Sequence, residues 1–322
     1  MQIIISSETN PYFNLALEEI LFKKFNKEYF LLYINTPSVI CGKHQIPFKE
    51  VRADIAYQQN IQICRRFSGG GTVYHDNGNL NFSYITNNQS SNEINIDFRK
   101  FTEPVFNFLL QKKLPASINE RNNILLDGKK ISGNAQHVAK KRTLHHGTLL
   151  FNTDLDMMNL ILTPQNNHYN DKSVRSAQAE ATNIYNYLQK KMNLQEFTND
   201  LSEFMKDIYR GQTSEVSEEI QQATIELSEN KYKTDKWVFG YSPAYEISGK
   251  IETESPDIDF FISVKEGHVN QVDSNSVQIK KFLELTLGKP HNPIEFSMIY
   301  CSFYNNTNAK TQKINPFIFN FF

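Results

Sequence analysis

The residues best suited to chemistry lie in a glycine-rich stretch near the first quarter of the chain. Three successive glycines, Gly69 to Gly71, follow Arg65, Arg66 and Ser68. Glycine has no Cβ and adopts positive φ without steric cost, so a ligand can approach this backbone closely. Its N–H groups can line a concavity for an anion, and the two arginines are expected to add positive charge at the mouth. The alternative is a flexible turn between two strands.

A second stretch supplies a lysine. Asp127-Gly128 between two extended runs predicts a two-residue β-hairpin turn. Alternation along the strands then places Lys130 on a face with an amide and a hydroxyl, whereas Lys129 shares the apolar face and reaches water. Lys130 is therefore the lysine placed to work in a site; the alternative is an ordinary solvated strand lysine. The expected pairs are Leu126 with Lys129, Leu125 with Lys130, Ile124 with Ile131, and Asn123 with Ser132.

Both stretches need strands and helices to hold them. Residues 61–64, 72–74 and 80–84 are predicted strands around the glycines, and residues 29–34 and 38–41 are predicted to form a hairpin. Asn10 and Pro11 begin a helix on which Glu18 and Glu19 are expected to face solvent. A later helix is expected to start near Thr102 or Glu103, because Pro104 follows.

The texture changes after Ala244, where short predicted strands precede a helix over residues 276–287. We therefore expect two domains, residues 1–246 and 247–322. The apolar end, residues 314–322, is expected to be either a buried last strand or an exposed aromatic tail.

Composition excludes several classes of protein. The 322 residues carry a formal net charge of −1, which argues against a nucleic-acid or membrane-surface binder. No apolar run approaches the ~18 residues of a membrane span, and the first residues lack the pattern of a signal peptide. Cys41, Cys64 and Cys301 are too few and too far apart for a disulfide framework or a zinc site. A cytoplasmic protein is expected.

Several motifs resemble those of lipoate–protein ligases. Residues 65–79 read Arg-Arg-Phe-Ser-Gly-Gly-Gly-Thr-Val-Tyr-His-Asp-Asn-Gly-Asn, and residues 127–133 read Asp-Gly-Lys-Lys-Ile-Ser-Gly. His145-His146-Gly147-Thr148 and Ser173-Val174-Arg175-Ser176 add two further matches. The resemblance implies an α+β fold: a biotin/lipoate ligase-like catalytic domain of mixed, mainly antiparallel sheets with flanking helices, followed by a small α+β C-terminal accessory domain.

The resemblance also implies an activity. Such enzymes use ATP and Mg²⁺ to convert lipoate to lipoyl-AMP, and then acylate a lysine of the lipoyl domains of 2-oxoacid dehydrogenases or of the glycine cleavage H protein. Lys130 would be catalytic and would also bind ATP. Other implied ATP-binding residues are Val73, Tyr74, Asn79 and Asn122, with Asn122 also near the metal. Implied residues for the lipoyl group or adenylate are Arg66, Ser68, Gly69, Gly70, Gly71, His75, Ser132, Gly133 and His146.

Two alternatives remain open at this level. One is an octanoyl or lipoyl transferase of the same fold, which works through a cysteine thioester and for which Cys64 is the only serious candidate. The other is a non-catalytic lipoate-binding module, suggested by Asn123 where many relatives have aspartate. The sequence does not separate lipoate from octanoate, which share a carboxylate and an apolar tail.

Overall fold

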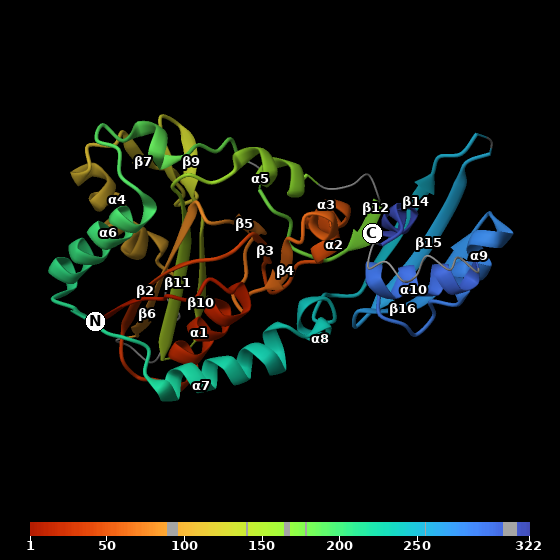
Figure 1. Cartoon of the computed structure of the whole chain (residues 1–322), viewed down its shortest axis with the longest axis horizontal. Coiled ribbons are helices and arrows are strands. Elements are labelled where there is room, and N and C mark those ends of the chain that lie inside the picture. The colour runs from red at the N-terminus through yellow and green to blue at the C-terminus, as the bar shows by residue number, and fades with distance from the viewer. Residues whose placement is uncertain (89–95, 140, 164–167, 178, 255, 305–313) are drawn as a thin grey trace.

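The computed structural model describes residues 1–88, 96–139, 141–163, 168–177, 179–254, 256–304 and 314–322. Over these residues a six-stranded mixed sheet forms the centre of the larger part of the molecule (Figure 1). Its strands β10, β11, β6 and β2 are antiparallel neighbours, and β1 and β13 continue it in parallel. In spatial order they are β10 (Asn134–Val138), β11 (Arg142–Leu150), β6 (Asn79–Asn87), β2 (Tyr29–Ile34), β1 (Gln2–Ile5) and β13 (Gln212–Thr213).

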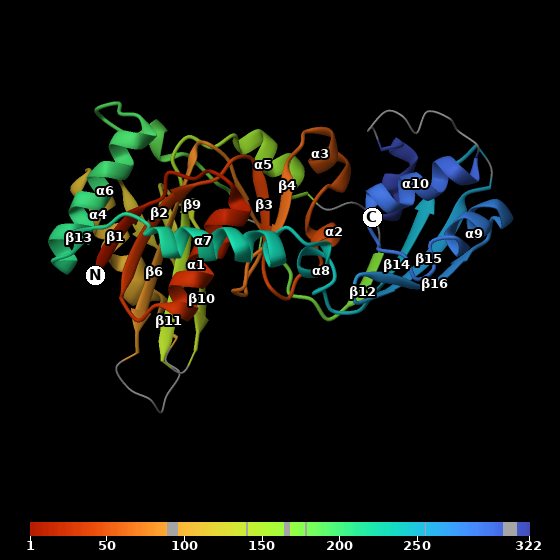
Figure 2. The same ribbon diagram turned by 60° about the horizontal axis from the view of Figure 1, so that its bottom comes forward.

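Helices cover both faces of this sheet (Figures 1 and 2). Phe30 and Leu32 of β2 pack with α4 (Phe98–Gln111) and α6 (Leu194–Tyr209). Leu31 and Tyr33 point the other way and pack with α1 (Pro11–Lys24) and α7 (Glu218–Leu227). A sheet buried on both sides explains why β2 is apolar along its length instead of alternating.

Two smaller sheets lie beside the large one and carry the residues of interest. The first is ordered β4 (Gln62–Arg65), β3 (Ser38–Cys41) and β5 (Val73–His75), and the second is the meander β7 (Ala116–Ile118), β8 (Ile124–Leu126) and β9 (Lys129–Ser132). The glycine-rich stretch therefore connects the two outer strands of the first small sheet. The remaining helices of this part are α2 (Pro47–Glu50), α3 (Ala53–Gln58), α5 (Leu155–Ile161), α8 (Asp235–Val238), a 3₁₀ helix (Ile184–Tyr187) and a π-helix (Ser228–Tyr232).

The C-terminal part is a four-stranded antiparallel sheet with helices against it (Figure 1). Its outer strand β12 comes from the middle of the chain, and its core is continuous with the sheet that contains β3. The predicted boundary after residue 246 stays a prediction. The elements are β12 (His168–Asp171), β14 (Tyr245–Ile251), β15 (Ile258–Lys265), β16 (His268–Ser274), α9 (Val277–Glu284), α10 (Pro293–Phe303) and a 3₁₀ helix (Pro316–Phe321).

The predicted α+β class, with mainly antiparallel sheets and flanking helices, is confirmed. Among the described residues, no helix combines the length and the apolarity needed to cross a bilayer. The end of the chain is buried, with Phe321 and Phe322 in the C-terminal core, but it forms a 3₁₀ helix instead of a strand.

Two local predictions are wrong for identifiable reasons. Residues 29–34 and 38–41 do not form a hairpin, because β2 belongs to the large sheet and β3 to a small one. Helix α4 begins at Phe98, with Asp97 as its N-cap, and Pro104 lies inside it. The Asp97 carboxylate accepts a hydrogen bond from the Lys100 N–H, and this cap starts the helix nearly two turns before the proline.

Candidate active site

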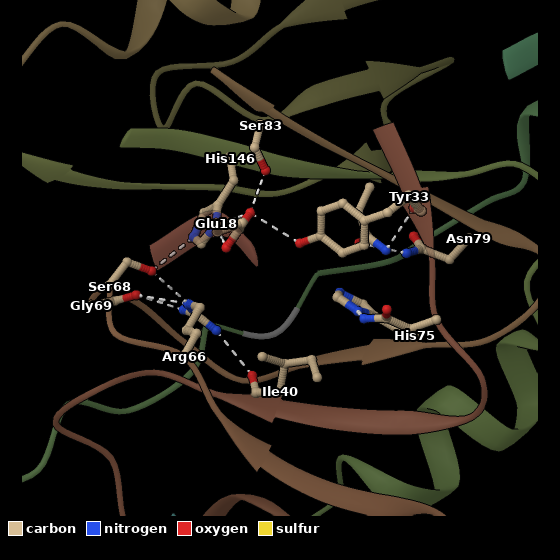
Figure 3. Close-up of polar contacts among 12 residues, drawn as sticks. Glu18, Tyr33, Ile40, Arg66, Ser68, Gly69, His75, Asn79, Ser83 and His146 are labelled. Atoms are coloured by element: carbon tan, nitrogen blue, oxygen red, sulfur yellow. Dashed lines mark hydrogen bonds and ion pairs between the residues drawn. The ribbon is translucent and has the colours of Figure 1, made fainter. Parts of the chain in front are cut away.

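Arg66 shapes the glycine-rich loop from within. Its guanidinium is buried and donates hydrogen bonds to the carbonyls of Ile40, Gly69 and Gly71 at 2.9, 2.6 and 2.7 Å (Figure 3). Gly70, between these acceptors, has a φ of +89°, which a residue with a side chain rarely adopts. The loop is therefore a fixed cradle around a guanidinium and not a flexible turn.

Arg65 does not lie at the mouth, and that prediction is wrong. Its side chain is fully buried on the other side of β4, where Nη1 donates to the carbonyls of Lys43 and Gln45 at 2.9 and 2.8 Å. Nη2 donates to the Val238 carbonyl and the Ser242 hydroxyl at 2.6 and 2.8 Å. Arg65 thus ties the glycine-rich strand to the segment that leads into the C-terminal part.

Glu18 does not face solvent, contrary to prediction; it is fully buried at the centre of a polar network. Its carboxylate accepts hydrogen bonds from the Ser83 hydroxyl and from the Tyr33 hydroxyl at 3.1 Å, and it lies 3.1 Å from Nδ1 of His146 (Figure 3). Burial alone would raise the pKa of Glu18, but these three partners outweigh it and leave the pKa lowered. Nε2 of His146 lies 2.8 Å from the Ser68 hydroxyl, so the network links α1 to the glycine-rich loop.

Glu19 is buried as well, on the neighbouring side of α1. Its carboxylate accepts hydrogen bonds from Lys23 and Lys231 at 2.6 Å each and from the Tyr232 hydroxyl at 2.5 Å. Glu19 is covered because the π-helix packs on α1, whereas Glu18 faces the large sheet, whose strands β2, β6 and β11 supply its partners. This covering is a tertiary effect that the periodicity of the helix does not reveal.

The predicted hairpin presents Lys130 to the site. Asp127 and Gly128 have φ of +45° and +79°, as a type I′ turn requires, and Leu125 pairs with Lys130. The pairing slips by one residue beyond that point, so Ile124 pairs with Ser132 and not with Ile131. The bulge leaves the faces unchanged near the turn: Lys129 lies outside, 2.6 Å from Glu180, and Lys130 faces inward.

Lys130 lines a cavity of about 190 Å³ between the glycine-rich loop, β9 and β11. Burial, and secondarily the nearby Arg121, lowers the pKa of its ammonium group. Among the described residues no carboxylate lines this cavity, so its cations are poised for an anionic ligand. The predicted site residues on its wall are Arg66, Gly71, Val73, His75, Lys130, Gly133 and His146.

Other predicted residues lie behind the wall or beside it. Ser68 and Ser132 are buried without lining the cavity, and Tyr74 lines an adjoining groove of about 610 Å³ that also reaches Lys130 and Val73. Asn122 offers its backbone carbonyl to the Asn134 amide at 2.8 Å. Four other predicted residues do not line the cavity: Gly69, Gly70, Asn79 and Asn122.

Several residues of the cavity wall are not predicted from the sequence. Ser176 lies in the Ser173-Val174-Arg175-Ser176 match, but the sequence does not reveal its contact: its hydroxyl accepts a hydrogen bond from the Thr72 N–H at 2.9 Å. Asn123 and Thr148 also lie in stretches compared with the family, but no site role is predicted for them. Leu15, Tyr33 and Ile40 carry no local signal, because α1, β2 and β3 meet only in the folded chain. Missed wall residues include Leu15, Tyr33, Ile40, Asn81, Arg121, Asn123, Asn134, Ala135 and Thr148.

The metal prediction finds little support in the donor set. Magnesium in proteins is usually held by one or two carboxylates together with substrate phosphates. No described carboxylate lines the cavity, and no cluster of three or more metal-ligating side chains occurs among the described residues. In the adjoining groove, Glu180 is paired with Lys129 and Glu50 accepts a hydrogen bond from the Ser176 N–H. The residues present do not fit a protein-held magnesium ion.

The cysteines are placed away from the cavity. Cys41 and Cys64 are fully buried, and burial raises the pKa of both thiols. Cys301 lies on α10 in the C-terminal part. A thioester route needs a reachable thiolate, and none of the described residues lining the cavity supplies one.

The family model of the lipoyl protein ligase A/B catalytic domain matches residues 10–206. Lipoate-protein ligase LplJ of Bacillus subtilis is 35% identical over 81% of this chain and 80% of its own length. Lipoate–protein ligase 1 of Staphylococcus aureus is 36% identical over 81% of this chain and 80% of its own.

Solved structures agree with this match. A lipoate-protein ligase A bound with ATP superposes with a TM-score of 0.65 at 27% identity, over 74% of this chain and 98% of its own. A Thermoplasma acidophilum homologue with bound lipoic acid gives 0.62 at 27% identity over the same shares. A bipartite lipoate protein ligase from that organism, described with its E2 lipoyl domain, gives 0.64 at 25% identity, over 79% of this chain and 98% of its own.

Proposed function

The chain belongs to the lipoate–protein ligase family, and from this we propose that it joins free lipoate to acceptor proteins at the expense of ATP. In the first step a carboxylate oxygen of lipoate attacks the α-phosphorus of ATP, and pyrophosphate leaves. In the second step the ε-amine of an acceptor lysine attacks the acyl carbon of lipoyl-AMP, and AMP leaves. Neither step needs a nucleophile from the enzyme, so its task is to position and to stabilise charge.

The observation that carries the proposal is the position of Lys130. It lines both the cavity and the adjoining groove, together with Val73 and Thr148. The cavity, with Leu15 and Ile40 on the same wall as its cations, would take the apolar chain and the carboxylate of the acid, and the groove that Lys130 also reaches would take the nucleotide. An ammonium group at their junction would neutralise the carboxylate and the α-phosphate as they react.

The predicted residues then divide by position. Arg66, Gly71, Gly133 and His146 would enclose the acyl group, and Val73 and Tyr74 would border the nucleotide. Ser68 and Glu18 would act through His146 without touching substrate. Because the donor set does not fit a protein-held ion, magnesium enters this proposal only as the counter-ion that ATP brings with its phosphates.

The acceptors in this proposal are lipoyl domains, as the archaeal ligase described with its E2 lipoyl domain suggests. We expect the acceptor lysine to belong to the lipoyl domains of 2-oxoacid dehydrogenases or to the glycine cleavage H protein. The three cysteines are free thiols, which agrees with a reducing compartment such as the cytoplasm.

The test is exchange of labelled pyrophosphate into ATP, measured with and without lipoate. A ligase of this kind shows exchange that depends on lipoate, because adenylation is reversible, and it needs no acceptor protein. Transfer of an acyl group from an acyl carrier without ATP would instead identify the acyltransferase alternative. Binding of lipoate with neither reaction would identify a non-catalytic module.

A further inference from the structure

The cavity wall contains an imidazole nitrogen that no atom of the described residues engages. His75, the last residue of β5, is only 4% exposed and lines the cavity. Its Nδ1 lies 3.0 Å from Nδ2 of Asn35, but its Nε2 is buried without a hydrogen-bond partner among the described residues. In Figure 3 the ring lies near Tyr33 and Ile40, and Arg66 lies on the far side of Ile40. A buried polar atom is normally satisfied, so this one points to a ligand.

The orientation of Asn35 is fixed by a second amide. Asn14 on α1 donates from Nδ2 to the Glu8 carbonyl at 2.8 Å and to Oδ1 of Asn35 at 2.9 Å, and its own Oδ1 accepts from the Ser6 hydroxyl. Since Oδ1 of Asn35 is thereby used as an acceptor, its NH₂ group must be the side that meets His75. Nδ1 of His75 is therefore an acceptor.

That arrangement determines where the imidazole proton sits. Burial, with smaller contributions from Arg66 and His146, lowers the pKa of His75 to about 3, so the ring is neutral at physiological pH. A neutral imidazole that accepts at Nδ1 carries its single proton on Nε2. The nitrogen left without a protein partner among the described residues, Nε2, is therefore a neutral N–H donor.

We propose that His75 donates a hydrogen bond from Nε2 to an oxygen of the bound substrate, and that Asn35 and Asn14 are positioning residues that hold it in this tautomer. The acceptor is a carboxylate or phosphate oxygen, the chemistry that a carboxylic acid and its adenylate share. Arg66, Arg121 and Lys130 already supply positive charge on this wall. A neutral donor adds a directional hydrogen bond without a further charge to desolvate. The inference deepens the proposed function and rests on it for the identity of the substrate.

Nitrogen NMR of histidine-labelled protein tests the tautomer and the contact without any turnover. In the free protein, His75 should show a protonated Nε2 and an unprotonated Nδ1, unchanged from about pH 5 to about pH 9. Octanoate alone supplies a carboxylate, and AMP alone supplies a phosphate. A shift of the Nε2–H signal with either one supports the inference and identifies the acceptor; no shift with either, or a proton on Nδ1, overturns it.

Asn35→Asp reverses the polarity of the positioning residue. The new carboxylate can still accept from Asn14, but it also accepts from Nδ1 of His75, which moves the proton there and raises the pKa of the ring. Below this raised pKa the imidazolium still donates from Nε2; above it Nε2 is a bare acceptor facing an anion. The KM for the carboxylic acid should therefore rise with pH in the variant, by about 10–100-fold over wild type on the alkaline side.

Few other ionisable groups near His75 would change its protonation as the pH is varied. Arg66 and His146 act on it across the cavity, and the neighbouring Asp76 is engaged by the backbone N–H groups of Gly78 and Asp154. Asn134→Asp places a carboxylate beside a different histidine, since Oδ1 of Asn134 lies 3.3 Å from Nε2 of His145; it should alter the His145 signals and leave the His75 tautomer as it is. The variant also loses the hydrogen bond from Nδ2 of Asn134 to the Asn122 carbonyl, so it is compared in the free protein only.

The outcomes separate this inference from the proposed function. Exchange of pyrophosphate without any response of His75 to octanoate or AMP would overturn the inference alone. A response of His75 in a protein that shows no lipoate-dependent exchange would overturn the proposed function alone. If Asn35→Asp does not fold, the NMR titration of the wild-type protein with octanoate and AMP still tests the contact of His75 with the substrate.

Discussion

Lys129 and Lys130 are neighbours on β9, yet their ammonium groups lie in opposite environments. Nζ of Lys129 lies 2.6 Å from Oε1 of Glu180, and both side chains of that pair are largely exposed. Lys130 instead lines the cavity beside Gly133, where a Cβ on the glycine would lie 2.9 Å from Nζ. The alternation of a strand turns a pair of adjacent lysines into one surface residue and one site residue.

Replacing Lys130 by Ala should reduce lipoate-dependent pyrophosphate exchange by about 10²–10³-fold, the scale for removing one preorganised electrostatic donor. Lys129→Ala is the matched control and should stay close to wild type, because Lys129 is paired with Glu180 on the surface and does not line the cavity. Equal losses in the two variants would contradict the assignment of Lys130.

The hairpin could be predicted because its information is local. Asp127 and Gly128 specify the turn, and the turn fixes which lysine faces inward. The one-residue slip at Ile124 could not be predicted, because it depends on how the pairing ends against the rest of the fold. The local sequence also does not predict the role of residues 35–37, which connect strands of two different sheets and do not form a hairpin turn.

The polar groups behind the site show the same limit. Glu18 and Arg65 look like surface charges in the sequence, and both are fully buried. Glu18 is covered only because α1 packs on the large sheet, and Arg65 only because the segment around Val238 closes over β4. The motifs therefore predict residues that line the cavity, such as Arg66 and Lys130, more readily than buried residues behind it, such as Glu18 and Arg65.

Gly42 sits against the glycine-rich loop with no room for a side chain. A Cβ at this position would lie 2.0 Å from the carbonyl oxygen of Gly70, so Gly42→Ala must displace the loop. We expect a loss of stability of about 1–3 kcal/mol, the range for overpacking, and weaker lipoate binding. Thermal unfolding measures the first effect. Gly69→Ala is the steric control, since nothing lies within 4 Å of its Cβ position; similar destabilisation of the two variants would argue against the close contact.

Arg65→Lys should destabilise the protein although it keeps the positive charge. A lysine cannot span the carbonyls of Lys43 and Gln45 on one side and the Val238 carbonyl and Ser242 hydroxyl on the other. We expect a loss of roughly 1.5–3 kcal/mol, the range for losing hydrogen bonds made by a charged group. Denaturant unfolding provides the measurement. Arg52→Lys, at a partly exposed pair with Asp54, is the matched control and should change stability by about 1 kcal/mol or less.

Glu18 should make stability fall in acid. Because its pKa is lowered in the folded protein from the ordinary 4.5, the carboxylate contributes stability above that value and loses it as pH falls through the folded pKa. Glu18→Gln should therefore be less stable than wild type at neutral pH, and the difference should shrink as the pH is lowered. Unfolding curves over a series of pH values test this. A difference that stays constant with pH would mean that Glu18 is not ionised in the native protein.

The cysteines provide the sharpest separation between ligase and acyltransferase. Cys64 lies on β4 immediately before the two arginines, but its thiol is fully buried and its pKa is raised well above the ordinary range. A thiol in that state is neither nucleophilic nor reachable at neutral pH. The triple variant Cys41→Ser, Cys64→Ser and Cys301→Ser should accordingly keep most of its lipoylation activity, with transfer still dependent on ATP. Since serine in a buried site can lower stability on its own, activity is measured per folded protein, with Cys301→Ser alone as the reference. An acyl group trapped on Cys64 by mass spectrometry, or transfer that disappears in Cys64→Ser while the protein remains folded, would replace the adenylate route by a thioester route.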